Sequence, residues 1–184
     1  MEREVLEVDV LFVGAGPASL AGAYHLARLV QAHNRTAASG AESPLEVSIA
    51  LIEKGPEIGS HALSGAVLDP IALRELIPDF AERGAPLQPV LRDEICFLTP
   101  RRHFRLPVVP PPLQNHANQI VSLGRLVRWL AGMLEKQGGV DLLPGFGGRE
   151  ILYEGERVAG VRTGDKGIDR NGQRKPNYEP GIDI

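Results

Sequence analysis

Three small residues near the N-terminus have the spacing of a nucleotide-binding turn. Gly14 and Gly16 are followed by Ser19, within the sequence Val13-Gly14-Ala15-Gly16-Pro17-Ala18-Ser19. A glycine at the first position permits a sharp turn from a strand into a helix, and a glycine at the second lets a diphosphate approach the backbone. A small third residue allows the helix to pack closely on the strand. Taken alone, this spacing also fits an ordinary glycine turn.

An acidic residue follows where a ribose ligand would be needed. Glu53 comes directly after the apolar stretch Glu46–Ile52, and a carboxylate at the end of the second strand accepts hydrogen bonds from the ribose of adenosine. Its distance from Gly14 exceeds the usual spacing of about 20 residues. We assign the excess to a polar loop over Asn34–Pro44, because insertions at the surface cost little. A solvated carboxylate is the alternative interpretation.

The residues after Glu53 favour FAD over NADP. Lys54 is a single basic residue, which does not indicate a pocket for a 2′-phosphate. The glycine-rich run "IGSHALSG" that follows would bring backbone close to a flat ring. The nucleotide-binding residues predicted from these patterns are Val13, Gly14, Ala15, Gly16, Pro17, Ala18, Ser19, Glu53 and Lys54.

The elements that must position these residues form an α/β pattern. A strand over Val8–Val13, a helix from Pro17 to about Ala32 and a strand over Glu46–Ile52 predict a right-handed βαβ unit. Further along we expect a helix over Pro70–Phe80, short strands over 81–120 and a helix from Ser122 to Gly138. A strand over Val140–Leu143, a hairpin over Glu150–Tyr153 and Arg157–Arg162, and a strand beginning near Ile182 complete the prediction.

Composition limits the other functions. The chain has 184 residues, 43% hydrophobic and 23% charged, with a net charge of −3, so nothing in the totals implies nucleic-acid binding. No apolar run approaches the roughly 20 residues that span a bilayer. The single cysteine, Cys96, cannot form an internal disulfide or hold an iron–sulfur cluster or structural zinc by itself. We expect it to be a buried strand thiol in a protein kept in a reducing compartment.

Several longer runs resemble one flavoprotein family. They are "GAGPA", "LIEKGPEIGSHALSGAVLDPIALRELIPD", "GAPL", "IVSLGRLVRWL", "LLPGF" and "GVRTGDKGIDRNGQRKPNYEPGI". In this order they resemble the electron transfer flavoprotein–ubiquinone oxidoreductase family, from about residue 8 to the end. The run "IGSHALSGAVLDP" is the specific part, because many flavoproteins share the glycine turn.

The resemblance implies a fold, cofactors and partners. Members bind FAD in a Rossmann-like domain of the glutathione-reductase type, carry a 4Fe-4S cluster, and pass electrons from reduced electron transfer flavoprotein to ubiquinone at a membrane surface. It places His61, Ser64 and Gly65 close to the flavin ring, although a loop-capping role is the alternative for His61 and Ser64. The cluster ligands are not in this chain. Peripheral or monotopic association with the cytoplasmic face of a bacterial inner membrane is the expected location.

The predicted elements also indicate an incomplete domain. Residues 1–80 would form the first βαβ unit and the flavin-proximal loop, 81–121 an inserted β-rich segment toward the substrate or quinone, and 122–184 the return helix, strand and hairpin. Because few parallel strands are predicted, we interpret the chain as the front of a longer protein, with a complete small protein as the alternative.

Two departures from the family and several surface residues complete the prediction. Ser19 stands where the family usually has glycine. The run "ANQIVSL" at Ala117–Leu123 differs from the usual family sequence, so no role is carried over to those residues. The run "RRHFRLPVVPPPL", which starts at Arg101, suits an anionic membrane surface or a plain exposed hairpin. The helix over Pro70–Phe80 would pack in the core or lie in a bilayer interface, and the resemblance favours partial membrane contact near this segment. Arg125 and Arg128 are either solvated or bind phosphate.

Electron transfer requires positioning more than acid–base chemistry, so we predict no catalytic residue and no metal ligand. Two other functions stay open at this point: an FAD-dependent reductase of the geranylgeranyl-reductase type, and an FAD-binding fragment without turnover.

Overall fold

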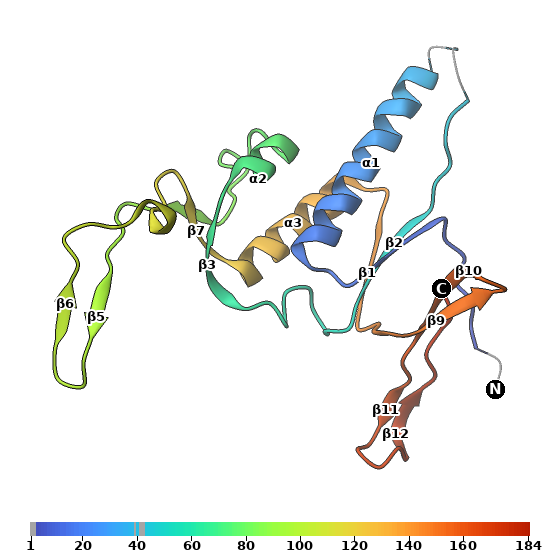
Figure 1. The fold of residues 1–184 in the computed structure, drawn as a ribbon. Coiled ribbons are helices and arrows are strands. Elements are labelled where there is room, and N and C mark those ends of the chain that lie inside the picture. The colour runs from blue at the N-terminus through green and yellow to red at the C-terminus, as the bar shows by residue number, and fades with distance from the viewer. Residues whose placement is uncertain (1–2, 39, 41–42) are drawn as a thin grey trace. The chain divides into compact units, whose positions relative to one another are not determined.

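The computed structural model describes residues 3–38, 40 and 43–184. The chain divides into two compact units, which are considered separately below. One unit comprises Met1–Ala62 and Val127–Ile184, and the other comprises Leu63–Leu126. Figure 1 shows the elements of both.

The first unit is built on a small parallel sheet. Strands β1 (Val10–Val13), β2 (Ile49–Glu53) and β8 (Asp141–Pro144) lie in the order β1-β2-β8. Both pairs are parallel. The apolar residues of β2 are buried on both faces, as a continuous apolar run predicts for a central parallel strand. The predicted strand–helix–strand order at the N-terminus is confirmed.

Helix α1 (Pro17–Ala37) packs on this sheet and on α3 (Leu123–Gln137). A Cβ atom at Gly22 would lie 3.1 Å from the ring of Phe12, so α1 approaches β1 closely at this glycine. The Gln137 amide donates to the carbonyl of Tyr24 at 3.2 Å, which fastens the end of α3 to α1. Helix α1 continues past its predicted end at Ala32. Its polar residue Asn34 is helical and holds Leu45 through two hydrogen bonds.

An antiparallel hairpin lies beside the parallel sheet. Strands β9 (Gly148–Glu154) and β10 (Arg157–Thr163) pair as predicted. The segment near Ile182 adds to β10, because the N–H of Val161 donates to the carbonyl of Ile184 at 2.7 Å. On the other side of this segment, the Leu6 N–H donates to the Asp183 carbonyl at 2.9 Å. A second hairpin, β11 (Lys166–Ile168) with β12 (Arg174–Glu179), precedes it.

The second unit contains an antiparallel sheet of strands β3 (Ser64–Leu68), β7 (Gln119–Ser122) and β4 (Leu87–Pro89), in the order β3-β7-β4. Val121 of β7 is buried, as are Leu73 and Ile77. The expected helix over Pro70–Phe80 is shorter, and α2 spans Ile71–Leu76. It ends at Leu76, because Ile77 precedes Pro78 and the residue before a proline avoids helical geometry.

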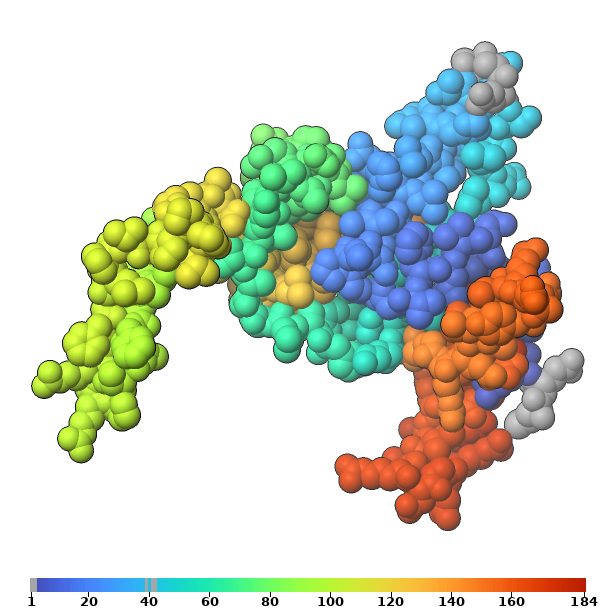
Figure 2. Space-filling model, viewed as in Figure 1, coloured from blue at the N-terminus to red at the C-terminus, as the bar shows by residue number. Residues whose placement is uncertain are grey.

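The second unit also contains a two-stranded hairpin whose strand residues are all exposed. Strands β5 (Cys96–Leu98) and β6 (His103–Arg105) pair only with each other among the described residues, and the 3₁₀ turn η1 (Pro111–Leu113) follows. Figure 2 shows this yellow-green segment as a narrow projection from the rest of its unit. The expectation that Cys96 is buried was wrong: the residue is exposed, and among the described residues its strand pairs only within this two-stranded sheet.

Candidate functional site

The glycine turn links β1 directly to α1. Gly14 has a φ of +93°, a conformation that favours glycine, and its N–H donates to the carbonyl of Ile52 at 2.8 Å. Gly16 is the N-cap of α1 and Pro17 begins the helix, where the missing proline N–H costs nothing. The turn is thus fixed by β2 on one side and by the helix on the other.

The first turn of α1 presents unused hydrogen-bond donors. The first helical bond runs from the N–H of Leu20 to the carbonyl of Gly16 at 3.0 Å, so the N–H groups of Ala18 and Ser19 precede the regular ladder. No side chain caps this end and its first turn has no acidic residue. A Cβ atom at Gly16 would meet nothing within 4 Å. The open space, the free donors and the helix dipole together suit an anion such as a diphosphate.

Glu53 points at this turn. One carboxylate oxygen, Oε2, accepts the N–H of Ala15 at 2.9 Å, and the other, Oε1, accepts the N–H of Gly55 at 2.8 Å. The side chain of Glu53 is 13% exposed. Burial alone would raise the pKa of Glu53, but the Gly55 and Ala15 N–H groups and nearby His61 outweigh it and lower that pKa below its ordinary value. The group is therefore an ionised acceptor beside the turn.

Two further predicted residues lie on the loop that follows Glu53. His61 places its Nδ1 atom 3.5 Å from Glu53 Oε1, and its side chain is 56% exposed. Lys54 is exposed, and its Cβ lies 3.1 Å from the position of a Cβ on Gly147. The first unit therefore brings the predicted turn, Glu53 and His61 into one neighbourhood, whereas Lys54 lies close to Gly147.

Ser64 and Gly65 belong to the second unit. Both are exposed on β3, where Gly65 has a φ of +82° at a shift in the β3–β7 register. The hydroxyl of Ser64 donates to the hydroxyl of Ser122 at 3.5 Å. Their predicted place near a flavin ring stays a prediction.

Gly55 is a site residue that the sequence analysis did not identify. Its N–H is one of the two backbone donors to Glu53, and its carbonyl accepts the N–H of Gly145 at 2.7 Å. The only sequence signal was a glycine close behind the strand-end acid, which is not distinctive in a chain with 21 glycines.

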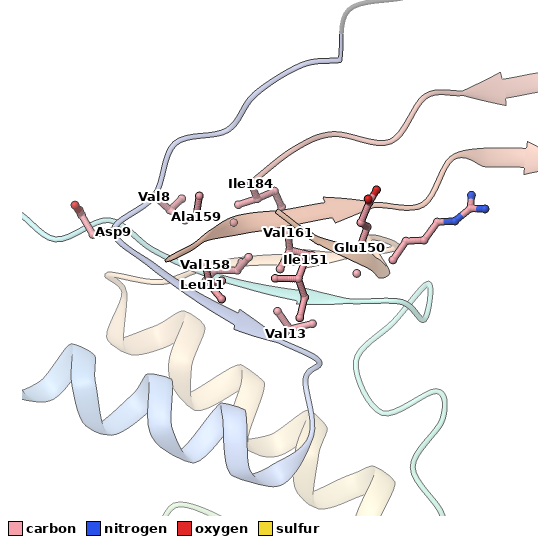
Figure 3. Close-up of a pocket in the computed structure, with 13 residues that line it drawn as sticks. Val8, Asp9, Leu11, Val13, Glu150, Ile151, Val158, Ala159, Val161 and Ile184 are labelled. Carbon is pink, nitrogen blue, oxygen red and sulfur yellow. The ribbon is translucent and has the colours of Figure 1, made fainter. Parts of the chain in front are cut away.

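A cavity of about 510 Å³ lies on the side of β1 away from the helices, beneath the β9–β10 hairpin. Figure 3 shows Leu11 and Val13 of β1 on one side of it, and Ile151 and Val161 of the hairpin on the other. The side chain of Val13 is therefore directed toward this apolar cavity. Only the backbone of Val13 is left to contact a nucleotide at the turn.

Comparison with solved structures defines the fold class. The flavin-dependent monooxygenase PieE, solved in complex with FAD and substrate, matches 98% of this chain and 29% of its own length with a TM-score of 0.60. The sequences are 17% identical, so the likeness concerns the fold. The chain has an α/β fold with mixed sheets that is shared with flavin-dependent enzymes. No family model matches the chain.

Curated relatives are more specific. The electron transfer flavoprotein-ubiquinone oxidoreductase of Pseudomonas aeruginosa is 44% identical over 190 residues, covering 100% of this chain and 32% of that protein. The mitochondrial protein of the same name from Arabidopsis thaliana is 41% identical over 184 residues, covering 99% of this chain and 27% of that protein. The resemblance to electron transfer flavoprotein–ubiquinone oxidoreductase is thus confirmed along the whole chain, which spans less than a third of either relative.

Among the described residues, no helix combines the length and the apolar character needed to cross a bilayer. The same part of the chain contains no group of three or more potential metal-binding side chains of the His, Cys, Asp or Glu type.

Proposed function

We propose that this chain is the FAD-binding part of an electron transfer flavoprotein–ubiquinone oxidoreductase. The observation that carries the proposal is the Glu53 carboxylate, bound to the Ala15 N–H at the uncapped start of α1. An anion cradle and a ribose acceptor thus occur together at one turn. The similarity to the curated oxidoreductases supports the reaction: electrons pass from reduced electron transfer flavoprotein, through FAD, to ubiquinone.

The residues of the chain fit the FAD that this function requires. FAD would supply the redox chemistry, since none of the side chains at the turn is redox-active. The backbone of Gly14–Ser19 binds the diphosphate, Glu53 accepts a ribose hydroxyl, and Lys54 and His61 border the same site. Ser64 and Gly65 approach the flavin ring. No residue here acts as a general acid or base, because electron transfer needs orientation and exclusion of competing reactions.

The finer fold is part of the proposal. We assign residues 1–80 and 122–184 to a glutathione-reductase-type FAD-binding domain, and 81–121 to an inserted β-rich segment toward the substrate. Strand β1 pairs only with β2 among the described strands, and Leu11 and Val13 on one of its faces line the apolar cavity. An unpaired edge strand beside apolar space supports the interpretation that the parallel sheet is incomplete.

The membrane-facing element is the β5–β6 hairpin. Phe97 and Phe104 stand opposite each other in its register and are 65% and 54% exposed. The connecting turn carries Arg101 and Arg102. Exposed aromatic side chains beside cations suit the surface of an anionic bilayer. Helix α2 is the weaker candidate because Leu73 is buried. The protein would then be peripheral on the cytoplasmic face of a bacterial inner membrane.

The iron–sulfur cluster belongs outside this chain in the proposal. A 4Fe-4S cluster requires several cysteine thiolates, and Cys96 is the single cysteine. Electron transfer flavoprotein and ubiquinone are the proposed partners, and nothing indicates nucleic acid.

FAD binding by the full-length apoprotein tests the proposal. Reconstitution should give a bound-flavin absorbance band, and Glu53→Gln should weaken FAD binding about 10- to 100-fold, since hydrogen bonds to a charged acceptor are worth about 1.5–3 kcal/mol. The control is Glu46→Gln, an exposed glutamate just before β2, which should bind FAD normally. A protein that retains no flavin would refute the proposal.

The reaction is tested separately. The reconstituted full-length protein should reduce a soluble ubiquinone analogue when supplied with reduced electron transfer flavoprotein. Retention of FAD without quinone reduction would favour the reductase alternative or a binding function without turnover.

A further inference from the structure

We propose that His61 and Gly55 are positioning residues for the nucleotide half of FAD, and that they act through Glu53 and not through contact with the flavin ring. The inference rests on the proposed FAD binding and deepens it. It gives the loop between β2 and β3 a role in binding the nucleotide, in addition to the predicted approach of this loop to the flavin ring.

The contacts around Glu53 come from both sides of the carboxylate. Ala15 approaches Oε2 from the glycine turn, while Gly55 and His61 approach Oε1 from the loop. A carboxylate has about four lone-pair directions, and these three groups occupy most of them. The carboxylate is therefore held in one orientation before any nucleotide arrives, with its remaining acceptor capacity beside the turn.

The lack of a side chain at Gly55 makes this arrangement possible. A Cβ atom there would lie 3.1 Å from Nδ1 of His61, 3.2 Å from Oε1 of Glu53 and 3.2 Å from the carbonyl oxygen of Glu57. All three distances are tighter than ordinary contact, so a side chain at position 55 would require His61 and the carboxylate to shift by about a few tenths of an ångström. The absence of a side chain at Gly55 thus favours the close approach of the loop to Glu53.

The position of His61 suits a role in orienting Glu53, the proposed ribose ligand. Its Nδ1 atom faces the partly buried carboxylate, whereas 56% of its side chain is exposed. The nearby charged side chains on the same loop are Lys54 and Glu57, both on exposed residues. A carboxylate that is already oriented loses less conformational entropy when it binds a ribose. Removing His61 should therefore weaken the hydrogen bond between Glu53 and the ribose.

Binding of two ligands distinguishes the two roles of His61. ADP contains the adenosine ribose and the diphosphate but no flavin, and its dissociation constant can be measured beside that of FAD by calorimetry on the full-length apoprotein. We expect His61→Leu to weaken both by the same factor, about three- to tenfold. His61→Gln, which keeps a donor, should recover most of the loss. His25→Leu removes an exposed histidine of α1 and should change neither.

A double-mutant cycle completes the test. If His61 acts through Glu53, His61→Leu should add little to the loss caused by Glu53→Gln, because coupled residues are not additive. A loss of FAD affinity with unchanged ADP affinity, or full additivity of the two variants, would overturn the inference. If the unaltered protein fails to bind FAD, the proposed function fails instead.

Discussion

At the scale of residues, the candidate site is a network of backbone donors around one carboxylate. Glu53 stays ionised although it is largely buried, because two N–H groups bind it. Its lowered pKa means that nucleotide binding through this carboxylate should persist at mildly acidic pH. The network depends on a glycine for space more than on any reactive side chain.

Gly55→Ala tests this dependence. The added methyl group would lie 3.1 Å from His61 and 3.2 Å from Glu53, so both side chains must shift and we expect FAD affinity in the full-length protein to fall about three- to tenfold. The control is Gly132→Ala, since a Cβ at this glycine of α3 meets nothing within 4 Å and alanine favours helices. Flavin titration followed by fluorescence is the measurement. Equal affinity in the two variants would show that crowding at position 55 is harmless.

At the scale of elements, the apolar residues of a strand join a core only where another layer of structure packs on that strand. Val121 is buried in the three-stranded sheet of the second unit, whereas Phe97 and Phe104 occupy a two-stranded sheet and are exposed. Isolated hairpins are marginally stable in water. Exposed aromatic pairs on such an element therefore fit an interaction surface better than a folding role.

The double variant Phe97→Asp/Phe104→Asp tests the proposed membrane contact. We expect flotation of the full-length protein with vesicles containing anionic phospholipid to fall by more than tenfold, because each buried phenylalanine contributes about 1.5–3 kcal/mol. Ile71→Asp alters an exposed apolar residue of α2 and should float as the unaltered protein does. The reverse pattern would assign the contact to α2.

At the scale of the whole molecule, the segment before β1 joins the last residues of the chain within the first unit, through backbone hydrogen bonds of Glu4 and Leu6 with Asp183. Arg3 forms an ion pair of 2.6 Å with Asp165, and Arg162 binds both carboxylate oxygens of Asp183 at 2.8 Å. The hydrogen bond to Arg162 is the main cause that lowers the pKa of Asp183. The N–H of Gly181 is the main cause for Asp165, aided by Arg3. These pairs close the antiparallel layer that flanks the parallel sheet.

Stability should therefore fall in acid. An aspartate has an unfolded-state pKa of about 3.9, and a lower folded value stabilises the fold above that pH and loses its effect as the pH falls through the folded pKa. We expect Asp183→Asn to lower the melting temperature at pH 7 and to flatten its decline between about pH 5 and pH 3. Asp141→Asn, at an exposed position of β8, should keep the original slope. Parallel slopes for Asp183→Asn and the unaltered protein would contradict this account.

Much of the local structure was predictable because its signals are local. The βαβ unit, the β9–β10 hairpin and the glycine turn each arise from residues close in the chain, whose apolar spacing and turn residues specify them. Predicted boundaries were less accurate. Helix α1 continues through polar residues interpreted as a loop, and α2 ends before Pro78.

The contacts of the candidate site were only partly predictable. The types of Glu53 and Gly14 indicated a nucleotide, but the approach of His61 to Glu53 depends on how a long loop returns. The exposure of Cys96 likewise depends on the absence of a covering sheet, which no local pattern records.

By itself, the sequence determined the strand–turn–helix unit, the acid that follows the second strand and the family that the chain resembles, because these depend on residue type and short-range spacing. Only the tertiary structure decided that Glu53 binds the Ala15 N–H, that Gly55 leaves room for His61, and that the two ends of the chain pair through Asp183. Those contacts join residues distant in sequence, and their energy exists only once packing has brought the groups within a few ångströms.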